Sequence, residues 1–231
     1  MVTQFLAEIE PSLSSIRLQR YQSTTGDDLE TAVNYLWNVQ LAEALYCSLG
    51  AVEIALRNAL HQTLTQHFGT PTWYNQKGLL EPNQVRTVRR AEDRIQGYGD
   101  PVTPERVVSQ LTFDFWVTIL SRNYSVRLWQ GQNAAPLKNA FMRIPKKKRR
   151  RQAIHQRYNE IRELRNRAFH HDPLFDDASL RQRHARVKQG LHWLNPRMVD
   201  WVEWYDRFPD VYANGRALVE AKLKAELGIL P

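Results

Sequence analysis

The fold is decided by the stretch "LAEALYCSLGAVEIALRNALHQTL" (Leu41–Leu64), in which large apolar residues recur every three or four positions. That spacing places them on one face of an α-helix. The helical pattern extends outward to about residues 29 and 68, where Gly69 and Pro71 end it. The apolar face consists of Leu41, Leu45, Leu49, Val52, Leu56, Leu60 and Leu64. We therefore predict one long buried helix, or an abutting pair, over residues 29–68.

Helical spacing also dominates the rest of the chain, whereas the alternation typical of β-strands is hard to find. Thr103 and Pro104 have the residue types of a helix N-cap and first helical position, and Pro145 can open another helix. We predict further helices over about 82–97, 104–120, 145–171, 177–193, from 196 onward, and 209–228. The predicted fold class is all-α, with one multi-helix domain over residues 1–231.

The composition is that of a globular protein, with 231 residues of which 42% are apolar. The one cysteine, Cys47, excludes an intrachain disulfide and fits a reducing compartment. The first residues, "MVTQFLAEIEPSLSSIRLQ", contain an early glutamate and no apolar run of signal-peptide length. No segment approaches the roughly 18 consecutive apolar residues of a membrane span. We therefore predict a cytoplasmic protein with no membrane partner.

The net charge of +8 comes mostly from one run, "KKKRRR", so the remainder of the chain is nearly balanced. A run of this kind is either a solvated, mobile patch or a contact surface for phosphates. It lies upstream on the helix predicted from Pro145, so a polyanion could touch both the run and the end of that helix. The candidate RNA-binding residues are Lys146, Lys147, Lys148, Arg149, Arg150 and Arg151.

The end of that predicted helix, "ELRNRAFHHDPLF" (Glu163–Phe175), gathers polar residues that could carry chemistry. Asn166 and His170 are four apart and share a face of the helix. Arg165 lies at the edge of that face, and its long side chain can swing toward His170. Pro173 ends the helix, because the residue before a proline is disfavoured in the α region. The candidate catalytic set is therefore Arg165, Asn166 and His170.

Arg167 and His171 form a neighbouring pair that points to the side, and they are auxiliary candidates. A helix end whose cations complement the helix dipole is the interpretation that spacing alone favours. A phosphodiester site, which needs a cation and a titratable imidazole, is the second interpretation. A metal site is the least favoured, because His170, His171 and Asp172 are consecutive and fan outward, and Cys47 supplies no CxxC pair.

Glu53, Arg57 and His61 form another polar set, spaced four apart beside the apolar face of residues 41–64. The favoured interpretation is a Glu53–Arg57 ion pair that supports a packed helix. All three are also possible auxiliary site residues. No serine nucleophile elbow, glycine-rich phosphate loop or paired acidic metal motif is recognisable.

The segment "LRNRAFHHDPLF" resembles the Arg-x4-His signature of HEPN-domain ribonucleases. Its form, Arg-Asn-x-x-x-His-His followed by an acidic residue, resembles the Abi-like (abortive infection) family of bacterial phage-defence proteins. The blocks "YLWNVQLAEALYCSLGAVEIALRNALHQTL", "GTPTWY" and "LTFDFWVTILSRNYSVRLW" are similar to that family's N-terminal and central blocks, in the same order. The resemblance covers about residues 33–205 and leaves a helical tail over about 206–231.

The resemblance implies a four-helix HEPN-like core and RNA cleavage that needs no metal or other cofactor. It assigns His170 as general acid or base, Arg165 as the group that stabilises charge on the phosphate, and Asn166 as an orienting residue. It further implies a homodimer with a composite active site and, for a toxin-type protein, a possible antitoxin partner. Phe169 departs from the small residue that this family usually has before the histidine pair.

Two other functions fit the same residues. A non-catalytic RNA-binding module would keep the fold and the basic run without cleaving RNA. A protein-interaction module would use the aromatic residues near the C-terminus, namely Trp193, Trp201, Trp204 and Tyr205, for which core packing is the favoured interpretation.

Overall fold

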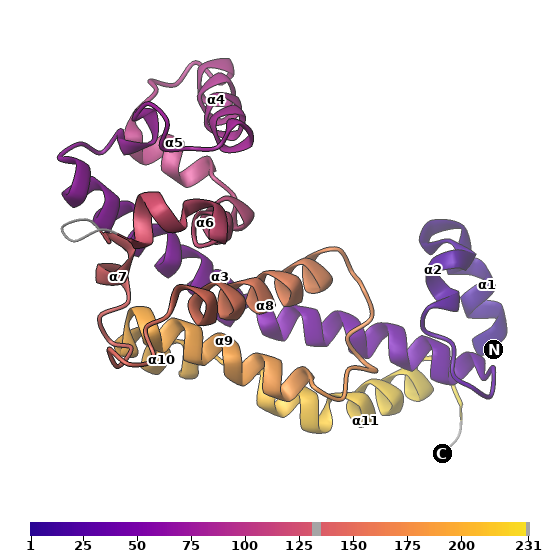
Figure 1. Ribbon diagram of the computed structural model, residues 1–231. Coiled ribbons are helices and arrows are strands. Elements are labelled where there is room, and N and C mark those ends of the chain that lie inside the picture. Colours follow the sequence, from indigo (N-terminus) through magenta and orange to yellow (C-terminus); the bar gives the residue numbers. More distant parts are fainter. Residues whose placement is uncertain (131–134, 230–231) are drawn as a thin grey trace. The chain divides into compact units, whose positions relative to one another are not determined.

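The computed structural model describes residues 1–130 and 135–229, and it confirms the all-α fold class (Figure 1). No β-strand occurs in these described ranges. Short 3-10 helices cover Trp73–Asn75 and Arg122–Tyr124, and a π-helical turn covers Ser125–Trp129. The α-helices are α1 (Val2–Leu13), α2 (Ser15–Gln19), α3 (Asp28–Phe68), α4 (Pro82–Gly97), α5 (Pro104–Gln110), α6 (Phe113–Ile119), α7 (Leu137–Ala140), α8 (Arg151–Phe169), α9 (Leu180–Leu194), α10 (Pro196–Glu203) and α11 (Phe208–Glu226).

The long helix predicted from the leucine pattern is α3, a single helix of 41 residues. All seven residues of its predicted apolar face are at most 1% exposed. By length and composition α3 could also cross a membrane, but core helices of soluble proteins meet the same criterion. We draw no conclusion about a membrane from α3.

Two predicted helices differ from the structure. The helix expected over 104–120 is interrupted, because Leu111 and Thr112 adopt extended backbone angles between α5 and α6. The helix expected from Pro145 begins only at Arg151, because the Pro145 carbonyl accepts turn hydrogen bonds from the N–H groups of Lys148 (2.7 Å) and Arg149 (3.1 Å). Most of the basic run therefore precedes α8 and does not lie on it.

By backbone proximity, the chain divides into two compact units. The first unit contains residues 1–49, 163–185 and 202–231, and the second contains residues 50–162 and 186–201. The helices α3, α8 and α9 each contribute residues to both units. The prediction of one domain over 1–231, with boundaries near 33 and 206, stays a prediction.

The first unit has a core made by α1, the start of α3, and α11. Val33, Val219 and Leu223 are buried there together with Leu6 and Ala32. The Trp37 indole N–H donates to the Val211 carbonyl at 3.1 Å, which ties α3 to α11. α11 lies beside the start of α3 in Figure 1, so the C-terminal helix is part of the core.

The second unit is built around large aromatic side chains. Trp73 packs against Trp116 with ring centroids 6.1 Å apart, and Phe141 packs against Tyr158 at 5.7 Å. The Tyr158 hydroxyl donates to the Gly190 carbonyl at 2.8 Å, which joins α8 to α9. A Cβ at position 190 would lie 2.7 Å from the terminal methyl carbon of Ile161, so a larger residue there would require that side chain to shift.

The burial pattern of α3 leads to a prediction about stability that compares a buried and an exposed residue of this helix. Leu56 is 0% exposed and Ile54 is 48% exposed. Leu56→Ala should lower the free energy of unfolding by about 2–5 kcal/mol, because it removes buried methyl groups and leaves a cavity. Ile54→Ala should change that free energy by less than about 0.5 kcal/mol. Urea unfolding followed by circular dichroism measures both, and equal losses would contradict the assignment of the buried face.

Candidate functional site

The end of α8, which carries the predicted catalytic residues, is a Schellman-type C-cap. The His171 N–H donates to the Ala168 carbonyl at 3.4 Å, and the Asp172 N–H donates to the Arg167 carbonyl at 2.9 Å. These two bonds satisfy carbonyls that the helix itself leaves unpaired. The residue that donates the first of these bonds has a left-handed backbone with φ of 56°, and glycine is the usual residue at this position of the cap. In this chain it is His171.

Contacts from the N-terminal segment hold His171 in this unfavourable conformation. The Tyr21 hydroxyl donates to the His171 carbonyl at 3.0 Å, and Arg17 donates to the same oxygen at 3.4 Å. Arg20 pairs with the Asp172 carboxylate at 3.0 Å. Two arginines from α2 and the residue after it therefore lie beside the histidine pair.

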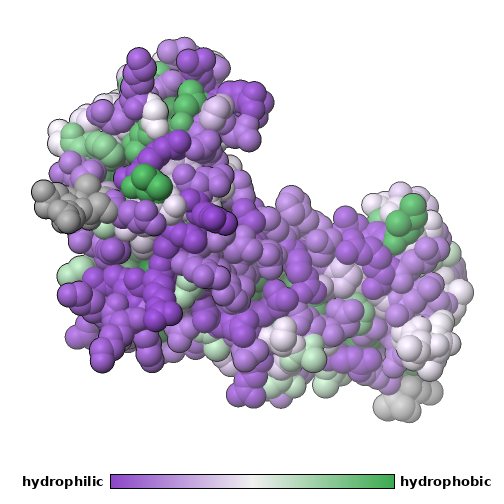
Figure 2. Space-filling model, in the orientation of Figure 1, coloured by the Kyte–Doolittle hydropathy of each residue, from purple (hydrophilic) through white to green (hydrophobic). Residues whose placement is uncertain are grey.

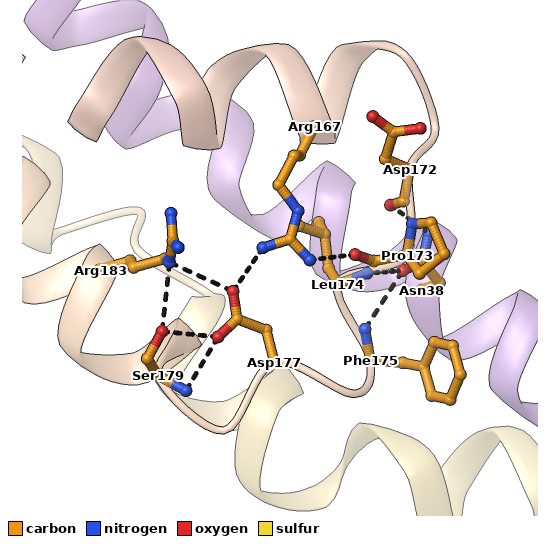
Figure 3. A network of polar contacts seen from close by, with 9 residues as sticks. All are labelled: Asn38, Arg167, Asp172, Pro173, Leu174, Phe175, Asp177, Ser179 and Arg183. Carbon is orange, nitrogen blue, oxygen red and sulfur yellow. Dashed lines mark hydrogen bonds and ion pairs between the residues drawn. The ribbon is translucent and has the colours of Figure 1, made fainter. Parts of the chain in front are cut away.

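Asn38, a buried residue of α3, binds the turn after α8 through both ends of its amide (Figure 3). Its Oδ1 accepts hydrogen bonds from the N–H groups of Leu174 (2.5 Å) and Phe175 (3.3 Å). Its Nδ2 donates to the Asp172 carbonyl at 3.4 Å and to the Tyr21 hydroxyl at 3.2 Å. This single side chain fixes the path of the backbone immediately after the histidines.

Arg167 belongs to a second set of polar contacts and points toward Asp177 and the Pro173 carbonyl (Figure 3). It pairs with Asp177 at 2.5 Å and donates to the Pro173 carbonyl. Asp177 also accepts hydrogen bonds from the backbone and hydroxyl of Ser179 and pairs with Arg183 at 3.2 Å. Burial raises the pKa of the Asp177 carboxyl, but the bonds from Ser179 and Arg167 outweigh it, and the pKa lies below its usual value. Arg167 is thus a structural cation.

Arg165 lies over an aromatic ring. Its guanidinium carbon is 4.5 Å from the centroid of the Phe169 ring, in cation–π geometry. The Phe169 ring in turn packs against Tyr46 of α3 at 5.8 Å. Phe169 therefore holds the Arg165 guanidinium against the ring that packs on α3, which gives a physical role to the bulky residue at this place.

Asn166 and His170 have exposed side chains, one turn apart at the end of α8. Their backbones are joined by the bond from the His170 N–H to the Asn166 carbonyl at 2.9 Å. Within residues 1–130 and 135–229, neither side chain has a hydrogen bond or ion pair with another residue. Both are therefore available to a ligand from solvent.

The set Glu53, Arg57 and His61 lies in the second unit, whereas Arg165, Asn166 and His170 lie in the first. Arg57 donates to Asn58 at 3.2 Å, and His61 accepts a hydrogen bond from the Trp73 indole at 3.0 Å. Burial lowers the pKa of His61 and Glu105 opposes the shift, so the imidazole is held neutral as an acceptor. These contacts favour a structural role for His61 and Arg57.

The basic run separates into residues with different surroundings. Arg149 is locked by bonds to the carbonyls of Ile144 (2.9 and 3.1 Å) and Met142 (2.7 Å), and Arg151 donates to the Leu120 carbonyl at 3.4 Å. Lys146, Lys147, Lys148 and Arg150 are exposed. Figure 2 shows a mainly hydrophilic face over the segment before α8 and over α9.

No group of three or more histidine, cysteine, aspartate or glutamate side chains that could hold a metal ion is found in the described part of the chain. Sequence reasoning missed Arg17, Arg20, Tyr21 and Asn38, which surround the turn after α8. The basic character of "SIRLQRY" was the available signal for the first three. Asn38 gave no signal, since a lone asparagine in a helical pattern has many possible roles.

Comparisons with protein-family models, with curated proteins and with solved structures gave no match to this chain. The assignment of the site therefore depends on the residues and geometry described above.

The left-handed backbone of His171 leads to a prediction about whether its side chain stabilises the turn. A side chain in this conformation costs about 1–2 kcal/mol, and a glycine's extra unfolded-state entropy offsets about 0.5–1 kcal/mol of that. His171→Gly should therefore raise the free energy of unfolding by about 0.5–1 kcal/mol, whereas His171→Val should lower it. Urea unfolding of both variants checks this. Destabilisation by glycine would show that the imidazole itself stabilises the turn.

Asn38 makes a second prediction. Asn38→Ala leaves the buried N–H of Leu174 and the partly buried N–H of Phe175 without an acceptor, so it should lower the free energy of unfolding by about 2–4 kcal/mol. Amide hydrogen exchange at Leu174 and Phe175 should become faster. Asn34→Ala is the matched control, because Asn34 lies one turn earlier on α3 and donates to the Tyr21 carbonyl instead. Slow exchange at both amides in Asn38→Ala would contradict the proposed anchoring.

Proposed function

We propose that this chain is a metal-independent endoribonuclease of the HEPN type, an Abi-like protein that acts as a toxin in cytoplasmic phage defence. His170 acts as general base or acid, Arg165 stabilises the phosphate, and Asn166 orients the phosphate or the imidazole. The observation that carries the proposal is the division within the motif. The Arg167 side chain and the His171 backbone build the helix end, whereas the side chains of Asn166, His170 and His171 stay exposed.

The proposed reaction is an in-line transfer within RNA. His170 removes the proton from a ribose 2′-hydroxyl, the 2′-oxygen attacks the adjacent phosphorus, and the bond from phosphorus to the 5′-oxygen breaks. A protonated general acid supplies the proton to the leaving 5′-oxygen. The products are a 2′,3′-cyclic phosphate and a 5′-hydroxyl. Arg165 offsets the negative charge that develops on the non-bridging oxygens.

Phe169 is compatible with this role for Arg165. The ring holds the guanidinium through a cation–π contact, which keeps its positive charge in place at the end of α8. Arg17 adds positive charge near His171 and favours approach of a polyanion, whereas the charge of Arg20 is offset by Asp172.

A homodimer would supply the second acid–base group from the partner's copy of the motif. An exposed aromatic surface supports self-association or an antitoxin contact, since Trp204 is 73% exposed and Tyr205 is 67% exposed. The expectation of core packing is wrong for these two residues and for Trp201, which is 49% exposed. The same observation favours the second candidate function, a protein-interaction module without catalysis.

The catalytic proposal predicts the effect of one substitution. His170→Ala should lower the rate of RNA cleavage by about 10²–10⁴-fold, because it removes the general base or acid. His192→Ala is the matched control, since His192 is also exposed and lies in the second unit. Gel analysis of a labelled RNA pool, incubated with purified protein in EDTA, measures the rates.

Four outcomes would contradict the proposal. Equal cleavage by wild type and His170→Ala would remove His170 from the chemistry. Loss of wild-type cleavage in EDTA would point to a metal. RNA binding without cleavage by the wild type would favour the RNA-binding module, and absence of both would favour the protein-interaction module.

A further inference from the structure

A pocket of about 740 Å³ lies in the second unit, between the segment before α8, the first turns of α8, and α9. This volume falls in the range of small-molecule binding sites. The side chains in its wall include five cations and one carboxylate, Glu160. The cations are Lys147, Lys148, Arg150, Arg157 and Arg186. The pocket therefore has a strong excess of positive charge.

The side chain of Arg157 gives the main structural reason to expect an anionic ligand in this pocket. Its Nε and Nη1 atoms are buried and have no hydrogen-bond partner among the described residues. Burial lowers the pKa of its guanidinium, which reflects the cost of holding the charge away from water. A buried charged donor without an acceptor is unfavourable. An anion in the pocket would relieve that cost.

Two further features of the pocket favour a phosphate. The first turn of α8, at Ala153, lies in the wall, and a helix N-terminus presents free N–H groups and a positive dipole end to an anion. Arg186 is already paired with Glu160 at 3.2 Å, which holds its guanidinium in place. The side chains of Lys148 and Arg150 are exposed at the rim of the pocket, so they can turn toward the charged oxygens of a bound ligand.

An aromatic side chain stands beside these cations. Trp193 lines the pocket, and its ring lies 5.4 Å from the guanidinium carbon of Arg157. Tyr158 packs against the same indole at 6.4 Å and fixes its orientation. Inorganic phosphate alone would leave most of this volume empty, whereas a base and sugar can occupy the space next to the ring. Cations next to a held aromatic ring are the combination that recognises nucleotides.

We propose that this pocket binds a nucleoside phosphate, with phosphate groups on Arg157 and on the rim formed by Lys148 and Arg150, and the base near Trp193. The ligand is either a free nucleotide or one nucleotide of a nucleic-acid strand. The proposal does not depend on cleavage by His170, because every residue it uses belongs to the second unit.

Isothermal titration calorimetry of the full chain tests the proposal with three probes. These are ADP, inorganic phosphate, and a 5′-phosphorylated deoxytrinucleotide, which lacks the 2′-hydroxyl and so resists the proposed cleavage. We expect ADP or the trinucleotide to bind at least about tenfold more tightly than inorganic phosphate. Binding of ADP indicates a free nucleotide as ligand, and binding of the trinucleotide alone indicates a strand.

Three variants make the test specific. Arg157→Gln should weaken nucleotide binding by about ten- to hundredfold, because it removes a charged hydrogen bond donor. The double variant Lys148→Gln/Arg150→Gln changes only exposed side chains, so it should weaken binding without disturbing the fold. Arg122→Gln is the control, since Arg122 is an exposed arginine of the same unit outside the pocket wall.

The proposal is overturned if neither nucleotide probe binds, if inorganic phosphate binds as tightly as both, or if the Lys148/Arg150 double variant binds like the wild type. His170→Ala should bind all probes like the wild type. Failure of cleavage with intact nucleotide binding would therefore reject the ribonuclease proposal and leave the pocket proposal standing.

Discussion

Both compact units bury residues from the same side of one helix, α3. Leu41 and Leu45 are buried in the first unit, and Leu56 and Leu60 are buried in the second. Within the first unit, the regular turns of α3 fix where the residues near these leucines point. Asn38 and Tyr46 use those positions to hold the turn after α8 and the ring of Phe169. The arrangement of the candidate site thus follows from the burial of α3.

The end of α8 shows how structural and functional roles are divided among adjacent residues. His171 occupies a place where glycine is usual. Hydrogen bonds from Tyr21 and Arg17 to its carbonyl offset the conformational free energy of its left-handed backbone. Arg167 is paired with Asp177 in a partly buried network. Asn166 and His170, by contrast, make no side-chain contribution to the turn. Strained backbone beside exposed polar groups is common at functional sites.

Sequence patterns predicted the elements that depend on local spacing. The leucines of α3 and the Pro82 start of α4 were sufficient to place those helices. Pro145 was misleading, because a proline suits the first position of a helix and the start of a turn equally well. The turn bonds to the Pro145 carbonyl and the side-chain bonds from Arg149 to the nearby Ile144 and Met142 carbonyls favour the turn. The break at Leu111 depends on packing that no local pattern reveals.

The candidate site was predictable only as a set of residue types. Spacing placed Asn166 and His170 on one face, but it could not assign Arg167 a structural role, because its partner Asp177 lies beyond the end of α8. The contact of Arg165 with Phe169, four residues apart on the same helix, was within reach of spacing. Arg20 meets Asp172 across 152 positions of sequence, so no local pattern links them. The basic run likewise divides into locked and exposed cations only once its turn is known.

The central claim is that the end of α8 cleaves RNA by using the ribose 2′-hydroxyl. Mass spectrometry of a short RNA after incubation with the protein in EDTA tests it most directly, with a second RNA that carries 2′-deoxyribose at the cleaved position. The account predicts 2′,3′-cyclic phosphate and 5′-hydroxyl ends from the first RNA and an intact second RNA. Cleavage of the deoxy-substituted position, or ends with a 5′-phosphate, would contradict it.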